Sequence, residues 1–238
     1  MEMAKASGVT LITVYDNYMH DPELKTGWGF SCLVEFENET ILFDTGGDSE
    51  TLLSNMERLG KDPKAIDKIV LSHIHGDHTG GLAGILEKNP NVTVYLPKSF
   101  PGDFKNDISS KVEVGSPFKI SESVMTTGEL GTWIKEQSLV INTEKGLVVI
   151  TGCAHPGIVD IVKEVKKLAS GEIYLVVGGF HLGGASDLEL KKIIGAFREL
   201  GVQRVSPSHC SGDRAKELFR EEYGEDFIDN GVGKVIEI

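Results

Sequence analysis

The residues best suited to chemistry in this chain lie at positions 73–78, where three histidines and an aspartate follow an apolar run. His73 and His75 would project to the same side of a strand, because side chains alternate across it. Asp77 and His78 add a carboxylate and a third imidazole from the following turn. Four donors so close together are more than a single metal ion needs from one segment of the chain. Imidazole and carboxylate ligands together suit zinc, iron or manganese. The spacing predicts a two-metal site; the alternative is a polar turn whose histidines cap a helix or face water.

Other polar residues also follow predicted strands. His155, His181 and His209 come after apolar runs, so six of the seven histidines occupy such positions, which scattered core histidines would not do. Asp44 ends another apolar run. Its carboxylate could hold a ligand histidine by the second ring nitrogen, and capping of a helix is the competing role.

The elements that must position these residues alternate along the chain. Hydrophobic patterns predict strands at 9–15, 32–36, 40–43, 69–71, 92–96, 137–142, 146–150, 172–177, 204–208 and 232–238, and helices at 49–59, 82–86, 158–169, 187–200 and 213–223. This rhythm favours a layered α/β fold. We expect residues 1–7 to be a flexible leader and 8–238 a single domain.

The section 97–136 is irregular and is expected to shape a substrate pocket. Phe100, Phe104, Phe118 and Trp133 would either line that pocket or form a small satellite core.

Composition narrows the classes of partner. The 238 residues carry 36 acidic and 24 basic side chains, a formal charge of -12, which argues against nucleic-acid binding but not against a small phosphorylated substrate. Three cysteines, no signal-peptide pattern and no apolar run of about 20 residues favour a reduced, cytoplasmic protein without a membrane segment. Cys153 and Cys210 could approach bound metal or pack in the core. The sequence leaves open whether the protein forms a homo-oligomer.

The His-x-His-x-Asp-His motif, with Phe43-Asp44-Thr45-Gly46 upstream, resembles the metallo-β-lactamase superfamily. The resemblance implies an α/β fold of four layers, an αβ/βα sandwich, with two divalent metal ions: zinc first, with iron, manganese and magnesium as alternatives. It assigns one ion to His73, His75 and His155 and the other to Asp77, His78 and His209. The superfamily commonly has a metal-bridging aspartate where this chain has His181, which leaves His181 as a ligand, a general acid or a donor to a substrate phosphate.

Motifs at 16–17, 28–31, 136–139, 151–155 and 178–182 resemble a narrower branch of metal-dependent hydrolases, labelled 7,8-dihydropterin-6-yl-methyl-4-(β-D-ribofuranosyl)aminobenzene 5′-phosphate synthase. This resemblance implies a hydrolase or transferase acting on a small phosphorylated, pterin-related substrate. The reaction would use a metal-activated hydroxide or a metal-stabilised diphosphate leaving group, with Asp77 and His181 as catalytic candidates.

Expected substrate contacts are Asn17, Gln137, His181, Ser211 and Arg214. For two of these the reason is local, because the turn at 211–212 could aim free amides of the helix 213–223 at an anion, with Arg214 in the first turn. Two alternative functions stay open: hydrolysis of a carbonyl substrate such as a lactam, thioester or lactone, and non-catalytic sensing of metal and ligand.

Overall fold

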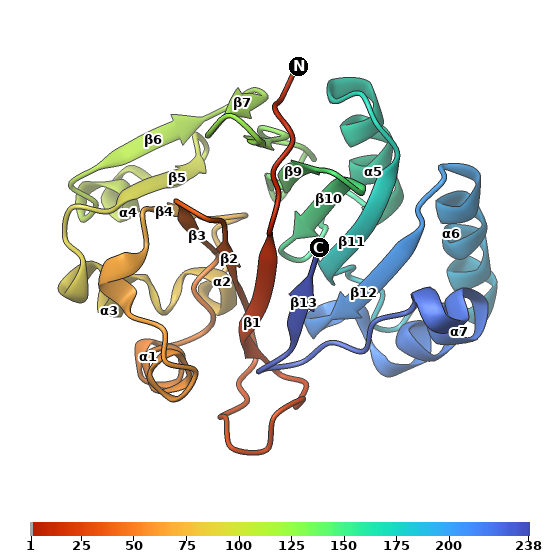
Figure 1. Ribbon diagram of the computed structural model, residues 1–238, viewed down its shortest axis with the longest axis horizontal. Helices are drawn as coiled ribbons and strands as arrows, with labels where there is room; N and C mark the ends of the chain where they lie inside the picture. The colour runs from red at the N-terminus through yellow and green to blue at the C-terminus, as the bar shows by residue number, and fades with distance from the viewer. Residues whose placement is uncertain (1) are drawn as a thin grey trace. The chain divides into compact units, whose positions relative to one another are not determined.

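The computed structural model describes residues 2–238, which divide into two compact units. Unit 1 contains the residues up to Ala6 together with Pro117–Asn230, and unit 2 contains Ser7–Ser116 and Gly231–Ile238. Each unit holds one mixed β-sheet with helices packed against it (Figure 1). The predicted α/β class is confirmed, whereas the expectation of a single domain over 8–238 stays a prediction.

The sheet of unit 2 has seven strands in the order β13-β1-β2-β3-β4-β5-β6. They are β1 (Thr10–Asp16), β2 (Phe30–Glu35), β3 (Thr40–Phe43), β4 (Lys68–Val70), β5 (Thr93–Pro97), β6 (Lys111–Val114) and β13 (Val235–Glu237). β13, β1, β2 and β3 pair antiparallel, whereas β3, β4, β5 and β6 pair parallel. Parallel neighbours need crossover connections, and helices supply them here.

The helices of unit 2 follow those connections. They are α1 (Ser49–Arg58), the 3-10 turn η1 (Pro63–Ala65), α2 (Gly76–Thr79), α3 (Leu82–Lys88) and α4 (Gly102–Asn106). Leu52 and Met56 of α1 and Ile85 of α3 are fully buried in the same core cluster as Leu42 and Ile69 of the sheet. The apolar stripe of each helix therefore covers one face of the strands that lead to residues 44 and 73.

The sheet of unit 1 has six strands in the order β12-β11-β10-β9-β8-β7. They are β7 (Phe118–Lys119), β8 (Val124–Thr126), β9 (Leu139–Thr143), β10 (Gly146–Thr151), β11 (Ile173–Gly179) and β12 (Arg204–Ser208). β10, β11 and β12 pair parallel, and β7, β8, β9 and β10 pair antiparallel. The carboxyl ends of β10, β11 and β12 consequently lie at one edge of this sheet.

The helices of unit 1 are α5 (Ile158–Leu168), α6 (Asp187–Glu199) and α7 (Asp213–Tyr223), with 3-10 turns η2 (His209–Ser211) and η3 (Gly224–Asp226). All three helices bury apolar residues in the core cluster that includes Val149, Val176 and Val205 of the sheet. A capping box between Ser186 and Glu189 fixes the start of α6. None of the helices in residues 2–238 has both the length and the apolar character that crossing a membrane requires.

The section predicted as irregular, 97–136, contains four short elements that the sequence patterns gave only in part: α4, β6, β7 and β8. Phe100 and Phe104 pack edge to face with ring centroids 5.2 Å apart, and both belong to the core of unit 2. Phe118 and Trp133 are 41% and 96% exposed. The first two aromatics therefore pack in or against the main core of unit 2 and not in a satellite core with Phe118 and Trp133. The role of this section in shaping a pocket stays a prediction.

The residues predicted as a leader pair with unit 1. The backbone N–H groups of Ala4 and Ala6 donate to the carbonyls of Glu122 and Asn142, at 2.9 and 2.8 Å. The Asn142 side chain donates to the carbonyl of Met3 at 2.9 Å. These bonds place residues 3–6 beside β9; the flexibility of the segment stays a prediction.

Candidate functional site

The candidate ligands of unit 2 surround one buried carboxylate. Because β3 and β4 are parallel neighbours, Asp44 and Ser72 follow them at the same edge of the sheet. Asp44 accepts hydrogen bonds from the Ser72 N–H (2.6 Å), the Ser72 hydroxyl (2.7 Å) and Nδ1 of His78 (2.7 Å). The side chain that caps α1 belongs to Asp48. Asp44 thus contacts a ring nitrogen of a candidate ligand, and the capping role falls to another residue.

This hydrogen-bond network assigns the imidazole tautomers. Since the carboxylate can only accept, Nδ1 of His78 carries the proton and Nε2 keeps its lone pair, 3.8 Å from the Asp77 carboxylate. The Ser72 hydroxyl donates to Asp44 and therefore accepts from Nδ1 of His73, at 2.8 Å. Nε2 of His73 then points its lone pair at Nδ1 of His75, 3.1 Å away.

These distances suit a divalent metal. Two nitrogens bound tetrahedrally to zinc at its usual bond length lie about 3.3 Å apart, close to the separation of the His73 and His75 ring nitrogens. His73 and His78 are fully buried, whereas His75 and Asp77 are half-buried. The donors of unit 2 therefore fit the metals that the sequence predicts, with histidine tautomers set by Asp44 directly or through Ser72.

Backbone bonds also fix this ligand loop, in addition to the bond from the Ser72 N–H to Asp44. The Thr45 N–H and hydroxyl both donate to the carbonyl of His78, at 2.8 and 3.0 Å, and the Gly80 N–H donates to the carbonyl of Gly46 at 2.9 Å. Gly29 passes so close that a Cβ there would lie 2.3 Å from the carbonyl of Asp77. The loop is consequently held by α2 and its neighbours.

In unit 1, three adjacent parallel strands deliver His155, His181 and His209 to one edge of the sheet. The His155 and His181 rings lie 4.5 Å apart between centroids. The non-glycine residues with positive φ in residues 2–238 are Asp44, Ala154, His181 and His209, at 56°, 62°, 53° and 48°. Each such conformation costs on the order of 1–3 kcal/mol and persists only where its surroundings enforce it. Backbone strain is therefore concentrated at the strand ends that carry the candidate ligands.

Glu136 holds the loop before His155 and had no individual role in the sequence prediction. Its side chain is 1% exposed, and its carboxylate accepts from the backbone N–H groups of Cys153 (3.0 Å), Ala154 (2.8 Å) and His155 (2.8 Å). The loop would otherwise leave these donors without carbonyl partners. The one sequence signal was an acidic residue in the motif at 136–139, which gave no hint of a loop 17 residues away.

Ser211 and Gln137, two of the predicted substrate contacts, are fully buried. The Ser211 hydroxyl donates to the carbonyl of Ser208 at 2.7 Å and accepts from the Phe180 N–H at 3.0 Å, which ties the ends of β11 and β12 together. Gln137 accepts from the Thr126 hydroxyl at 2.6 Å. Both side chains have structural partners, and their contact with substrate stays a prediction.

Arg214 and Asn17, two further predicted contacts, lie in different units. Arg214 in the first turn of α7 pairs with Asp187 at 2.5 Å and with Glu217 at 3.0 Å, so its charge is already balanced by two carboxylates. Asn17 follows β1 in unit 2 and is half-buried. Their role toward a substrate stays a prediction, as does that of the exposed His181.

The pKa values of the thiols in the two units are shifted in opposite directions. A hydrogen bond with Cys153, reinforced by His181 and His209, lowers the pKa of Cys210 to about 4. The hydrogen bond with Cys210 in turn raises the pKa of His181. In unit 2, burial raises the pKa of Cys32 to about 12. The pKa of Cys210 in unit 1 is thus lowered and that of Cys32 in unit 2 is raised.

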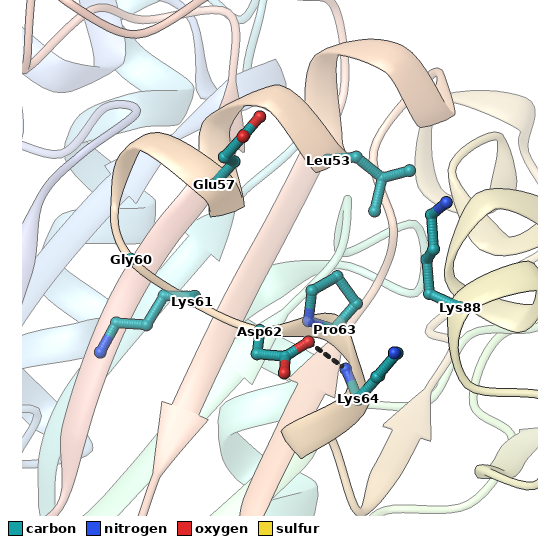
Figure 2. A pocket seen from close by; sticks show the side chains of 8 residues that line it. All are labelled: Leu53, Glu57, Gly60, Lys61, Asp62, Pro63, Lys64 and Lys88. Atoms are coloured by element: carbon teal, nitrogen blue, oxygen red, sulfur yellow. Dashed lines mark hydrogen bonds between the residues drawn. The ribbon is translucent and has the colours of Figure 1, made fainter.

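A separate hollow of about 410 Å³ opens on unit 2 beside α1, η1 and α3 (Figure 2). Its lining residues are Leu53, Glu57, Gly60, Lys61, Asp62, Pro63, Lys64 and Lys88. The lining residues lie on α1, on η1 and the turn before it, and at the end of α3. The candidate ligands at 73–78 directly follow the carboxyl end of β4. No histidine lines this hollow, so it is distinct from the candidate site.

Comparison with known proteins identifies a family model and several relatives that match this chain. A family model described as the metallo-beta-lactamase superfamily matches residues 28–163. The 7,8-dihydropterin-6-methyl-4-(beta-D-ribofuranosyl)-aminobenzene-5'-phosphate synthase of Methanocaldococcus jannaschii is 32% identical, with 99% of each chain covered. A ribonuclease Z of Nanoarchaeum equitans is 34% identical over 44% of this chain and 35% of its own.

A solved structure gives the same fold over nearly the whole chain. The crystal structure of Tm1679, a metal-dependent hydrolase of the beta-lactamase superfamily, matches with a TM-score of 0.81 and 30% identity, covering 97% of this chain and 99% of that one. This match confirms the αβ/βα fold class that the histidine motif predicted.

Proposed function

Because the chain belongs to the metallo-β-lactamase superfamily, we propose that it is a metal-dependent enzyme acting on a small phosphorylated, pterin-related compound, as a hydrolase or a transferase. The observation that carries the metal dependence is the network around Asp44, which leaves Nε2 of His73 and Nε2 of His78 as lone-pair donors. The substrate class rests on the synthase of M. jannaschii, which aligns with this chain from end to end.

The proposed metal ligands form two sets of three residues. His73, His75 and His155 would hold one ion, and Asp77, His78 and His209 the other. Bound divalent metal supplies a Lewis acid that lowers the pKa of coordinated water to about 7 and stabilises charge on phosphoryl oxygens. Zinc is the first choice from the histidine-rich donor set, with iron, manganese and magnesium as alternatives.

The remaining residues would act on the substrate. His181, exposed at the end of β11 and with a pKa raised by its hydrogen bond to Cys210, would donate a proton to a leaving group or a hydrogen bond to a phosphate oxygen. In hydrolysis the group displaced leaves with that proton. In transfer the departing group is a diphosphate, and water must be kept out so that the second substrate can attack.

Two histidine substitutions test the metal dependence. We expect His75→Ala and His155→Ala each to lower bound metal, measured by elemental analysis, together with turnover. His20→Ala is the matched control, because this exposed histidine lies outside both ligand sets. Full turnover by a metal-free variant would refute the proposal.

A substrate panel separates the reaction classes. Phosphate or diphosphate release from phosphomonoesters, phosphodiesters and pterin diphosphates is expected. Ring opening of lactams or lactones without phosphate release would instead favour a carbonyl substrate. Metal binding without turnover on any member would favour a sensor.

A further inference from the structure

Two cysteines and a histidine of unit 1 form a cluster that the proposed ligand sets do not use. Cys153, His181 and Cys210 each present one ligand atom, and these three atoms lie within 4.8 Å of one another. They come from the loops after β10, β11 and β12, three neighbouring parallel strands. None of the cysteines in the described chain forms a disulfide.

The cluster has the composition of a soft-metal site. Thiolate and imidazole together favour zinc and its heavier congener cadmium over magnesium or calcium. In a tetrahedral zinc site two sulfurs lie about 3.8 Å apart, as the usual bond lengths require. Ligand atoms that are already within 4.8 Å of one another would need to move by about 1 Å or less.

The surrounding chain holds these atoms close together. Gly179 faces Cys210, and a Cβ at that position would lie 2.8 Å from the sulfur, so glycine makes room for Sγ against the end of β11. The Cys210 thiol lies 3.6 Å from the carbonyl of Cys153. Glu136 fixes the Cys153 N–H, and the His181 side chain hydrogen-bonds with Cys210.

We propose that Cys153, His181 and Cys210 bind a thiophilic divalent ion of the zinc–cadmium class, with a fourth position open to water or an exogenous ligand. The site is built by unit 1 alone. The site uses none of the donors at 73–78. His181 would share one metal ion with two sulfur ligands, whereas the superfamily commonly has at this position an aspartate that bridges two metal ions. The proposal shares His181 with the proposed function, but it predicts binding whether or not the enzyme turns over.

Cadmium titration of the full chain tests the site without any activity measurement. Metal-free, reduced protein is titrated with cadmium chloride while the ultraviolet charge-transfer band of cadmium thiolate is recorded. Wild type should show a band of two-thiolate intensity. Cys210→Ser should lose about half of the intensity and weaken binding about tenfold or more, since one of three protein ligands is lost.

Matched variants decide whether the site belongs to unit 1. Cys32→Ser should keep the band and its midpoint, because this thiol lies outside the cluster. His181→Gln should keep both sulfurs, and hence the band, while weakening binding about tenfold. The His181 variant also keeps the test decisive if Cys210→Ser fails to fold. An unchanged midpoint in His181→Gln, or loss of the band in Cys32→Ser, would overturn the proposal.

Discussion

Both units place a buried carboxylate behind their histidines, but the two carboxylates act on different parts of the chain. Asp44 of unit 2 reaches imidazole rings, directly at His78 and through Ser72 at His73. Glu136 of unit 1 reaches backbone amides, those of residues 153–155. The difference follows from the loops. In unit 2 Asp44 accepts from one backbone amide, that of Ser72, and helix α2 and backbone bonds hold the loop beside it, whereas in unit 1 Glu136 accepts from three successive amides.

The different contacts predict that Asp44 acts mainly on metal binding and Glu136 mainly on stability. Loss of Asp44 should mainly change which ring nitrogen carries the proton, and therefore how well metal binds. Loss of Glu136 should mainly leave three backbone N–H donors unsatisfied. It should therefore lower the stability of unit 1. Substitutions at these two positions can confirm or break the distinction.

The largest effect is expected from Glu136→Ala. Each buried N–H left unpaired costs about 1–3 kcal/mol, so three should cost roughly 3–9 kcal/mol of unfolding free energy. Urea unfolding of metal-free protein measures this loss. Glu144→Ala, an exposed glutamate in the β9–β10 turn, is the control and should stay within about 0.5 kcal/mol. Glu136→Gln, which keeps one carbonyl oxygen, should fall between the two. A loss below about 1 kcal/mol for Glu136→Ala would show that the loop finds other acceptors.

Asp44→Asn should leave the fold in place and weaken metal binding. An asparagine amide at this position can donate to Nδ1 of His78, which moves the ring proton to Nε2, the nitrogen facing Asp77. Loss of such a partner typically lowers metal affinity about 10–100-fold. Calorimetric titration with zinc measures the change.

Asp48→Asn is the matched control, because asparagine caps a helix about as well as aspartate. Its zinc affinity should equal that of wild type. If Asp44→Asn lowered stability by several kcal/mol without changing affinity, Asp44 would be structural in the manner of Glu136.

The thiols give a pH-dependent contrast. A folded-state pKa of about 4 for Cys210 lies below the ordinary thiol value, so its stabilising contribution is present above that ordinary value and is lost as pH falls through about 4. In metal-free protein, alkylation of Cys210 by iodoacetamide should therefore keep a constant rate from about pH 8 to pH 6, where an ordinary thiol slows about tenfold per unit. Mass spectrometry of each peptide measures the rates.

Cys32 in the same sample is the internal control. Burial raises its pKa to about 12, so it should stay unmodified over this range. A tenfold fall per pH unit at Cys210 would show that the hydrogen bonds from Cys153 and His181 do not hold a thiolate in solution.

The parts of the site that the sequence could predict are those that local spacing controls. Histidines after apolar runs and Asp44 at a strand end occupy positions that depend only on where each strand stops. Glu136 could not be recognised, because its partners are backbone amides brought close by the fold of β9 against β10. The contact between His181 and Cys210 likewise depends on β11 lying beside β12, which is a matter of strand order.

The secondary structure likewise contains elements that the sequence could predict and elements that it could not. The long amphipathic helices and apolar strands were predicted close to their observed bounds, because burial of one face imposes a strong periodicity. The short α4 and β8, at Gly102–Asn106 and Val124–Thr126, were not predicted. Both lie in the irregular section 97–136, where no apolar run stands out from the surrounding loops as it does for the equally short β3 and β4.

The smallest effect, and the sharpest test of the relay in unit 2, is expected from Ser72→Ala. Removing the hydroxyl leaves the Asp44–His78 contact intact but frees Nδ1 of His73 from its acceptor, so zinc affinity should fall only about three- to tenfold. Stability should fall by about 1 kcal/mol, the net value of a hydrogen bond. Because the hydroxyl acts through the carboxylate, the effects of Ser72→Ala and Asp44→Asn on affinity should not add in the double variant. Additive losses would mean that Ser72 orients His73 without help from Asp44, and the two carboxylates would then differ less than their contacts indicate.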